Sequence, residues 1–227
     1  MENTFSYLLD MHLERPNLMT GLIAVVISSM FIKNKVSGYL TVFLFLTGFY
    51  LAELLASLIP ILRPSKPENT DYYNFIQLPE LCSLLWVFTK SILKRKIRIT
   101  FHILNLLFFA SHLFICAFIL KWDIISIYTI IPMMGIVAFA GIIYLRQQLS
   151  GEQTNPLSFP LVWLAIGTII SYLGSIPITC YIKYFGAINE QLALKLLTIN
   201  EILFCIWYII ISIGLIWTYK TRIRYSY

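Results

Sequence analysis

Seven long apolar runs, separated by short polar segments, account for most of the chain. A helix that crosses a bilayer needs about 20 predominantly apolar residues, and each run is close to that length. The runs are continuous and do not alternate apolar with polar positions, so they predict helices and not barrel strands. The spans that we expect are residues 17–34, 38–62, 73–93, 99–120, 123–145, 157–182 and 197–219.

The composition agrees with this pattern. Hydrophobic types make up 59% of the chain and charged types 12%, whereas soluble domains are about 45–50% apolar and roughly 25% charged. We therefore expect an all-α, seven-transmembrane-helix bundle that forms a single domain over residues 1–227. No polar stretch is long enough for a nucleotide-binding, kinase or DNA-binding domain, so a signalling role would require a second chain.

The distribution of Lys and Arg predicts the orientation of the chain. Of the 17 such residues, eleven fall in segments that share one side of the membrane and six in segments on the other. Because Lys and Arg are enriched on the cytoplasmic side, the N-terminus is expected outside and the C-terminus in the cytoplasm of a cell inner-membrane protein. The net charge of +6 reflects this bias and does not indicate nucleic-acid binding.

The densest basic run is KSILKRKIR, Lys90–Arg98, in a segment predicted to be cytoplasmic. Lys94, Arg95, Lys96 and Arg98 have two interpretations. They contact anionic lipid headgroups of the bilayer, or they dock on an acidic face of a cytoplasmic or membrane signalling partner.

Ionisable side chains inside the predicted spans are rare, and such groups are costly in a membrane and often functional. At about 1.5 Å of rise per residue, Glu53 lies about 14 Å, Glu80 about 10 Å and His112 about 12 Å from the outer ends of their helices. Glu201 lies about 6 Å from the start of its predicted span. All four fall in the outer half, and Tyr50 and Tyr172 lie deeper, where they can line the same space.

Two interpretations of these groups stay open. In the first, Glu53, Glu80, His112 and Glu201 converge on a ligand or ion pocket that faces outward. In the second, each group is neutral and hydrogen-bonded to a neighbouring helix, so that it fixes the bundle.

The sequence contains little that indicates an enzyme or a cofactor-binding protein. A zinc site usually has three His, Cys or carboxylate ligands with an open fourth position, and the chain has three histidines, without HxxxH or HExxH spacing. A retinal Schiff base would need a lysine within Thr198–Thr218, where there is none. We therefore expect no enzyme activity, no metal and no cofactor.

The four cysteines, Cys82, Cys116, Cys180 and Cys205, all lie in predicted helices without CxxC spacing. Packing is the simplest interpretation, with a disulfide between Cys180 and Cys205 as the alternative. In residues 157–182, Gly167, Ser171 and the pair Gly174–Ser175 recur at helical spacing. Small residues of this kind let helices approach closely, either within the bundle or in a homodimer.

Three segments carry a resemblance to a known family. They are FYLAELLASLIP, NTDYYNFIQLPELCSLLWVF and PLVWLAIGTIISYLGSIPI, the last with Trp163, Gly167, Tyr172 and Gly174 in a W-x-x-x-G and Y-x-G pattern. With them the chain resembles an uncharacterised family of short seven-helix membrane proteins of Bacteroidota. The resemblance implies a frequent genomic neighbourhood with histidine kinases and response regulators, and hence a sensory or accessory role.

The sequence thus favours a non-enzymatic integral membrane sensor or accessory subunit that acts through a cytoplasmic partner. The alternative is a small-solute or ion transporter with a polar site in the outer half of the bundle. A transporter would need polar residues that continue through the inner half, and the sequence offers few there.

Overall fold

The computed structural model describes residues 15–32, 38–62, 70–120, 127–150, 155–185 and 188–225, and this part of the chain is almost entirely helical. Its seven long helices confirm the predicted all-α bundle. They are α2 (Pro16–Met30), α3 (Tyr39–Leu62), α4 (Thr70–Lys90), α5 (Arg95–Phe114), α6 (Ile127–Leu149), α7 (Pro160–Phe185) and α8 (Glu190–Tyr225). A π-helical turn, Ile115–Ile119, continues α5, and a short 3-10 turn, Pro156–Ser158, precedes α7.

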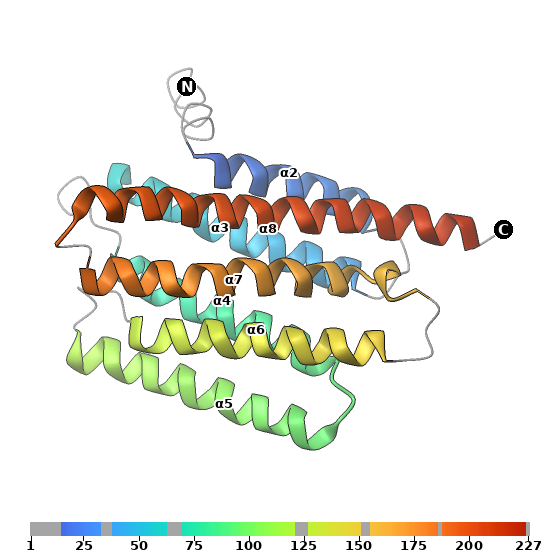
Figure 1. Ribbon diagram of the computed structural model, residues 1–227, viewed down its shortest axis with the longest axis horizontal. Helices are drawn as coiled ribbons and strands as arrows, with labels where there is room; N and C mark the ends of the chain where they lie inside the picture. Colours follow the sequence, from blue (N-terminus) through green and yellow to red (C-terminus); the bar gives the residue numbers. More distant parts are fainter. Residues whose placement is uncertain are drawn as a thin grey trace.

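Successive helices run in opposite directions along the bundle (Figure 1). We call the end of the bundle where α2, α4, α6 and α8 begin the first end, and the end where they finish the second end. Helices that follow one another are thus antiparallel, as short connections require. The basic residues Lys33, Lys35, Arg63, Lys66 and Lys121, which contribute to the predicted orientation, lie outside the described residues.

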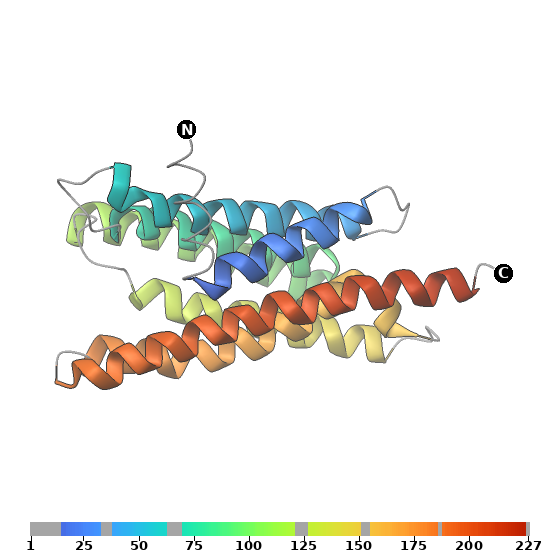
Figure 2. The ribbon, with the colours of Figure 1, turned by 90° about the horizontal axis from the view of Figure 1, so that it is seen from above.

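Six of the helices form a closed ring. Around it, α2 packs on α3, α3 on α4, α4 on α6, α6 on α7, α7 on α8, and α8 returns to α2. The remaining helix, α5, lies outside this ring against α4 and α6, and Figures 1 and 2 show it at the edge of the bundle. Side chains on α5 therefore have no direct route to the interior of the ring.

In the described residues, five helices are long and apolar enough to cross a membrane, namely α3, α5 with its π turn, α6, α7 and α8. The chain is thus a multi-pass membrane protein. The helix α2 is shorter, and α4, which carries Gln77 and Glu80, is not among the five. Both are members of the ring.

Several helix bounds differ from the predicted spans. The largest difference is in α8, which begins at Glu190 instead of 197 and continues to Tyr225. Its 36 residues make it about 54 Å long, and it extends past its neighbours at the second end (Figures 1 and 2). Hydropathy marks only the part of a helix that lies in lipid, whereas the start is set by a cap: the Asn189 side chain accepts a hydrogen bond from the backbone N–H of Leu192 at 3.0 Å.

Close packing of α7 on α8 explains the small residues in residues 157–182. A Cβ on Gly167 would lie 3.0 Å from the Trp207 ring, and one on Gly174 would lie 2.9 Å from Leu203. Ser171 donates a hydrogen bond to the Leu203 carbonyl at 2.9 Å. The small residues therefore serve packing within the bundle, and the homodimer stays a prediction.

Toward the second end the ring is filled with apolar side chains. Val42, Leu46, Leu84, Val137 and Leu215 are all fully or almost fully buried there. Buried hydroxyls in this half are bonded locally: Thr89 and Thr218 both donate to backbone carbonyls of their own helices, at 2.9 Å and 2.8 Å. This half of the bundle is a packed core.

Candidate ligand-binding cavity

A cavity of about 380 Å³ opens inside the ring, in the half toward the first end. All six ring helices contribute to its walls. The lining residues are Arg15, Asn17, Phe49, Glu53, Tyr73, Gln77, Glu80, Leu81, Ile127, Ile130, Met134, Tyr172, Ser175, Thr179, Ile182, Leu197, Asn200, Glu201 and Phe204. The volume is in the range of pockets that take small ligands, about 300–1,000 Å³.

Helical periodicity places these side chains. On α4, Tyr73, Gln77 and Glu80 are four and three residues apart, and on α7 Tyr172, Ser175 and Thr179 are three and four apart. Residues at these spacings share one face of a helix. Polar stripes on α4 and α7 therefore face each other across the ring, while α6 contributes apolar side chains.

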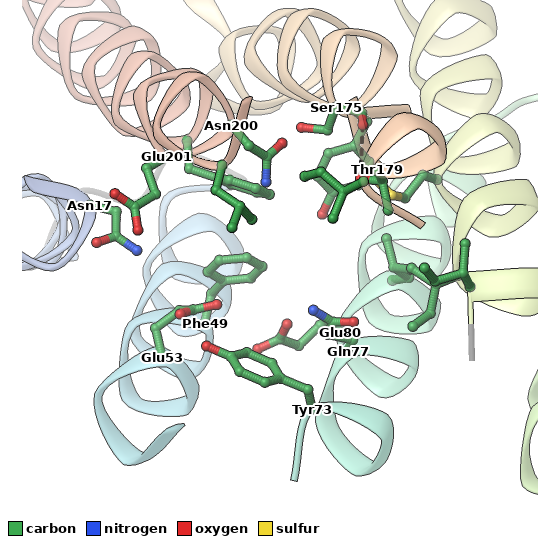
Figure 3. A pocket seen from close by; sticks show the side chains of 18 of the residues that line it. Asn17, Phe49, Glu53, Tyr73, Gln77, Glu80, Ser175, Thr179, Asn200 and Glu201 are labelled. Atoms are coloured by element: carbon green, nitrogen blue, oxygen red, sulfur yellow. Dashed lines mark hydrogen bonds between the residues drawn. The ribbon is translucent and has the colours of Figure 1, made fainter. Parts of the chain in front are cut away.

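Three oxygen atoms at the cavity wall lack hydrogen-bond partners. They are Glu80 Oε1 on α4, Ser175 Oγ on α7 and Asn200 Oδ1 on α8, and all three atoms are buried. Among the described residues, two further buried side-chain atoms, Thr47 Oγ1 and Asn105 Oδ1, also lack partners, but neither residue lines the cavity. Buried polar groups are normally satisfied, so three unpartnered oxygens at one cavity point to an occupant. Figure 3 shows Asn200 and Ser175 on one side of the open space and Glu80 on the other.

Glu53, in contrast, has partners. The phenol of Tyr73 lies beside its carboxyl group (Figure 3), and Arg15 acts on it as an opposite charge. Arg15 is held in place because its Nη1 donates to Ser57 Oγ at 2.8 Å, and Ser57 Oγ in turn donates to the Glu53 carbonyl at 2.9 Å. The positive charge of Arg15 therefore offsets part of the cost of burying the Glu53 carboxyl group at the cavity.

No such compensation reaches Glu80. Within the described residues, the ionisable group that acts on it is Glu53, a second carboxyl. A buried carboxyl group without a cationic partner is costly. Glu80 is thus a buried carboxyl group of the site for which no compensating positive charge is found among the described residues.

Glu201 lies at the rim. It is exposed, and Figure 3 places its carboxyl group beside Asn17 of α2, away from the centre of the cavity. Because α8 begins at Glu190, Glu201 is eleven residues into the helix, which is about 16 Å along its axis. The predicted span placed it only about 6 Å from the start of the helix.

Aromatic rings close the cavity on the side of the packed core. Phe49 lines the cavity, and its ring centroid lies 5.1 Å from Trp207 and 6.1 Å from Phe204. Trp207 is fully buried, and its indole N–H donates to Thr168 Oγ1 at 3.3 Å. This aromatic cluster joins α3 to α8 directly beneath the polar groups.

The structure brings together four of the six predicted pocket residues, Glu53, Glu80, Tyr172 and Glu201. Tyr50 does not line the cavity. It is 100° around the helix from Phe49 and packs instead against Leu18 on α2. For the four that do line it, a role in binding stays a prediction.

His112 is the second residue that the structure separates from the cavity. It lies on α5, outside the ring, and is buried between neighbouring helices. Its Nδ1 bonds to Thr129 Oγ1 of α6 and its Nε2 to the Asn74 carbonyl of α4, both at 2.6 Å. This is the arrangement expected of a group that fixes the bundle.

Among the described residues, no group of three or more His, Cys, Asp or Glu side chains is placed to hold a metal ion. All four cysteines are free thiols, so the structure does not support the alternative of a Cys180–Cys205 disulfide. Cys116 contributes a contact of 3.4 Å from its sulfur to His112 Nε2.

The predicted contact residues Lys94, Arg95, Lys96 and Arg98 lie at the second end, opposite the cavity, and the first three are exposed. The turn before them is held by Gln147 of α6. Its Oε1 accepts from the Leu93 N–H at 2.8 Å, and its Nε2 donates to the Ser91 carbonyl at 3.0 Å. A basic surface is thus anchored to a helix that also lines the cavity.

Comparison with known proteins gives no assignment: no family model, no curated protein and no solved structure matches the chain. The likeness to a Bacteroidota membrane family therefore stays a prediction, and function must be argued from the cavity itself.

Proposed function

We propose that the chain is a non-enzymatic membrane sensor or accessory subunit that binds a small solute in this cavity and acts on a partner chain. The observation that carries the proposal is the set of three buried, unpartnered oxygens on α4, α7 and α8. A buried polar group that stays unsatisfied costs about 1–3 kcal/mol. A ligand that satisfies these oxygens would stabilise one arrangement of these helices.

The position of the cavity supports a route for the signal. Ile127, Ile130 and Met134 of α6 line it near the first end, and Gln147 of the same helix holds the turn before the basic run at the second end. A small shift of α6 on ligand binding would move that turn. We infer that Lys94, Arg95 and Lys96 then present a changed surface to an acidic face of a cytoplasmic partner.

The packed core supports a sensor over a carrier. Carriers typically bind near the bilayer midplane, between broken helices of bundles that rock against each other, whereas the half of this ring toward the second end is filled by Leu46, Leu84 and Leu215. Uptake of a solute into vesicles that contain only this protein would favour the transporter instead.

The basic run and the excess of Lys and Arg on one side support an inner-membrane location with the second end in the cytoplasm. In that orientation the cavity faces the cell envelope. The sensor would then report a solute outside the cytoplasm.

The test is complementation of a deletion strain of the host, with the set of transcripts altered by the deletion as the readout. The cavity variant carries Glu80→Gln and Asn200→Leu. The surface variant carries Lys94→Gln, Arg95→Gln and Lys96→Gln. The control carries Leu106→Ala, at a position on α5 that is 70% exposed. Membrane levels are matched by immunoblotting.

We expect the wild type and the control to restore the transcripts, and neither the cavity variant nor the surface variant to do so. Full restoration by the cavity variant would overturn sensing through this site. Full restoration by the surface variant alone would leave the cavity in place and overturn the assigned output surface.

A further inference from the structure

We propose that the ligand is a small organic cation, a protonated amine with an apolar or aromatic body. This inference rests on the proposed function, since it names the chemical class of the solute that the same cavity binds. It is argued from the kinds of atoms that are unpartnered, from the charges around them and from the apolar wall.

All three unpartnered atoms are oxygens, and they belong to a carboxyl group, a hydroxyl group and an amide carbonyl. An ionised carboxyl group and an amide oxygen only accept hydrogen bonds, and a hydroxyl group can accept. The occupant therefore has to be a donor. A primary ammonium group has three N–H donors and no acceptor, so every hydrogen bond that it makes in the cavity satisfies an acceptor.

The charges around the cavity also favour an ammonium group. Arg15 acts on Glu53, but Glu80 has no basic partner in the described part of the chain and has Glu53 as its charged neighbour. A ligand that carries one positive charge would compensate Glu80. A carboxylate or phosphate ligand would add a further negative charge to an acidic cavity.

The size and the walls argue for an organic cation and against a bare metal ion. A cavity of about 380 Å³ is far larger than the shell of oxygens around a single ion. Phe49 and Phe204 provide aromatic surface next to the polar groups, and Ile130 and Met134 provide apolar surface on α6. Aromatic faces attract ammonium groups, and the apolar wall suits a hydrocarbon body.

Burial gives the site its specificity. Ser175 is only 1% exposed, and its unpartnered Oγ lies at the cavity wall. A neutral ligand without donors would leave Glu80 Oε1, Ser175 Oγ and Asn200 Oδ1 unsatisfied. Sites built for hydrogen bonding reject analogues that lack the group, so an alcohol of the same shape, with a single O–H donor, should bind much more weakly than the amine.

The experiment uses the full chain in lipid nanodiscs, with binding measured by calorimetry and by the shift in thermal unfolding. The probes share one shape and differ in charge: 2-phenylethylamine, 2-phenylethanol and phenylacetate. Sodium chloride alone is a fourth probe. The variants are Glu80→Gln, which keeps the shape and removes the charge, and Ser175→Ala, which removes one unpartnered hydroxyl. Glu190→Gln, at an exposed position outside the cavity, is the matched control.

We expect saturable binding of 2-phenylethylamine and little binding of the other probes. Glu80→Gln should weaken amine binding about 30-fold or more, as expected for loss of a buried charge partner. Ser175→Ala should weaken it about 2-fold to 10-fold without lowering thermal stability. Glu190→Gln should bind as the wild type does.

Three outcomes would overturn the ligand class. They are binding of the alcohol or carboxylate as tight as that of the amine, a stabilising shift with sodium ions alone, and no binding of any probe. Each leaves the proposed function intact if the cavity variant still fails in the complementation test. If that variant restores the transcripts, the sensor itself fails, whatever the probes show.

Discussion

At the scale of single residues, the polar groups inside the bundle divide into two kinds. His112 has a partner on each side, Thr129 on α6 and Asn74 on α4, and it connects helices. Glu80, Ser175 and Asn200 line a cavity, and each has a buried oxygen without a hydrogen-bond partner. From the sequence, these groups look alike, because all are polar residues in apolar spans.

This division predicts the effect of His112→Leu. The substitution removes two hydrogen bonds between helices, so we expect the free energy of unfolding in nanodiscs to fall by about 1–3 kcal/mol. Probe binding to the remaining folded protein should not change, since His112 does not line the cavity.

His102→Leu is the matched control, because His102 is exposed on the same helix. It should alter stability by less than about 0.5 kcal/mol. Equal effects of the two substitutions, or a loss of binding in His112→Leu at unchanged stability, would contradict the structural role.

At the scale of elements, the close contact of α7 with α8 forms one side of the ring. Its closest point is Gly214, where a Cβ would overlap the Trp163 side chain. Trp163 is itself fixed, since its indole N–H donates to the Leu157 carbonyl at 2.9 Å. A side chain added at Gly214 would therefore have to displace α7 or α8.

Gly214→Ala should consequently destabilise the bundle. Overpacking of this kind typically costs about 1–3 kcal/mol, measured as a lower midpoint of thermal unfolding in nanodiscs. Because α8 carries Asn200, the displaced helix should also weaken binding of the amine probe.

Gly48→Ala provides the contrast, because a Cβ at Gly48 meets nothing within 4 Å. There the higher helix propensity of alanine should leave stability unchanged or raise it by up to about 1 kcal/mol. A Gly214→Ala protein as stable as Gly48→Ala would show that the contact with Trp163 is not rigid.

At the scale of the whole molecule, the number and kind of helices could be predicted because lipid demands long apolar runs. The start of α8 could not be read from hydropathy, but Asn189 was a recognisable cap. Parts of the cavity were also within reach: Tyr73, Gln77 and Glu80 form a polar stripe at helical spacing in the sequence itself. The structural role of His112 could not be predicted from the sequence. Whether α5 lies inside or outside the ring depends on packing between distant segments.

The orientation of the molecule is a prediction from charge alone, and it decides from which side a solute would reach the cavity. With the N-terminus outside, the first end and its cavity face the envelope, and the Gln147-anchored basic surface faces the cytoplasm. Two positions at opposite ends test this directly. Ile188, between α7 and α8, and Leu93, between α4 and α5, are each 80% exposed.

In a chain whose four native cysteines are replaced by alanine, Ile188→Cys and Leu93→Cys are each labelled in intact cells with a membrane-impermeant maleimide. We expect Ile188→Cys to react, and Leu93→Cys to react only after the cells are permeabilised. The parent chain without cysteines must still restore the transcripts for the result to apply to the working protein. The reverse labelling pattern would place the cavity in the cytoplasm. A solute from outside would then have to cross the packed core to reach Glu80, so an envelope sensor would be ruled out on geometry, while the binding chemistry of the cavity would stand.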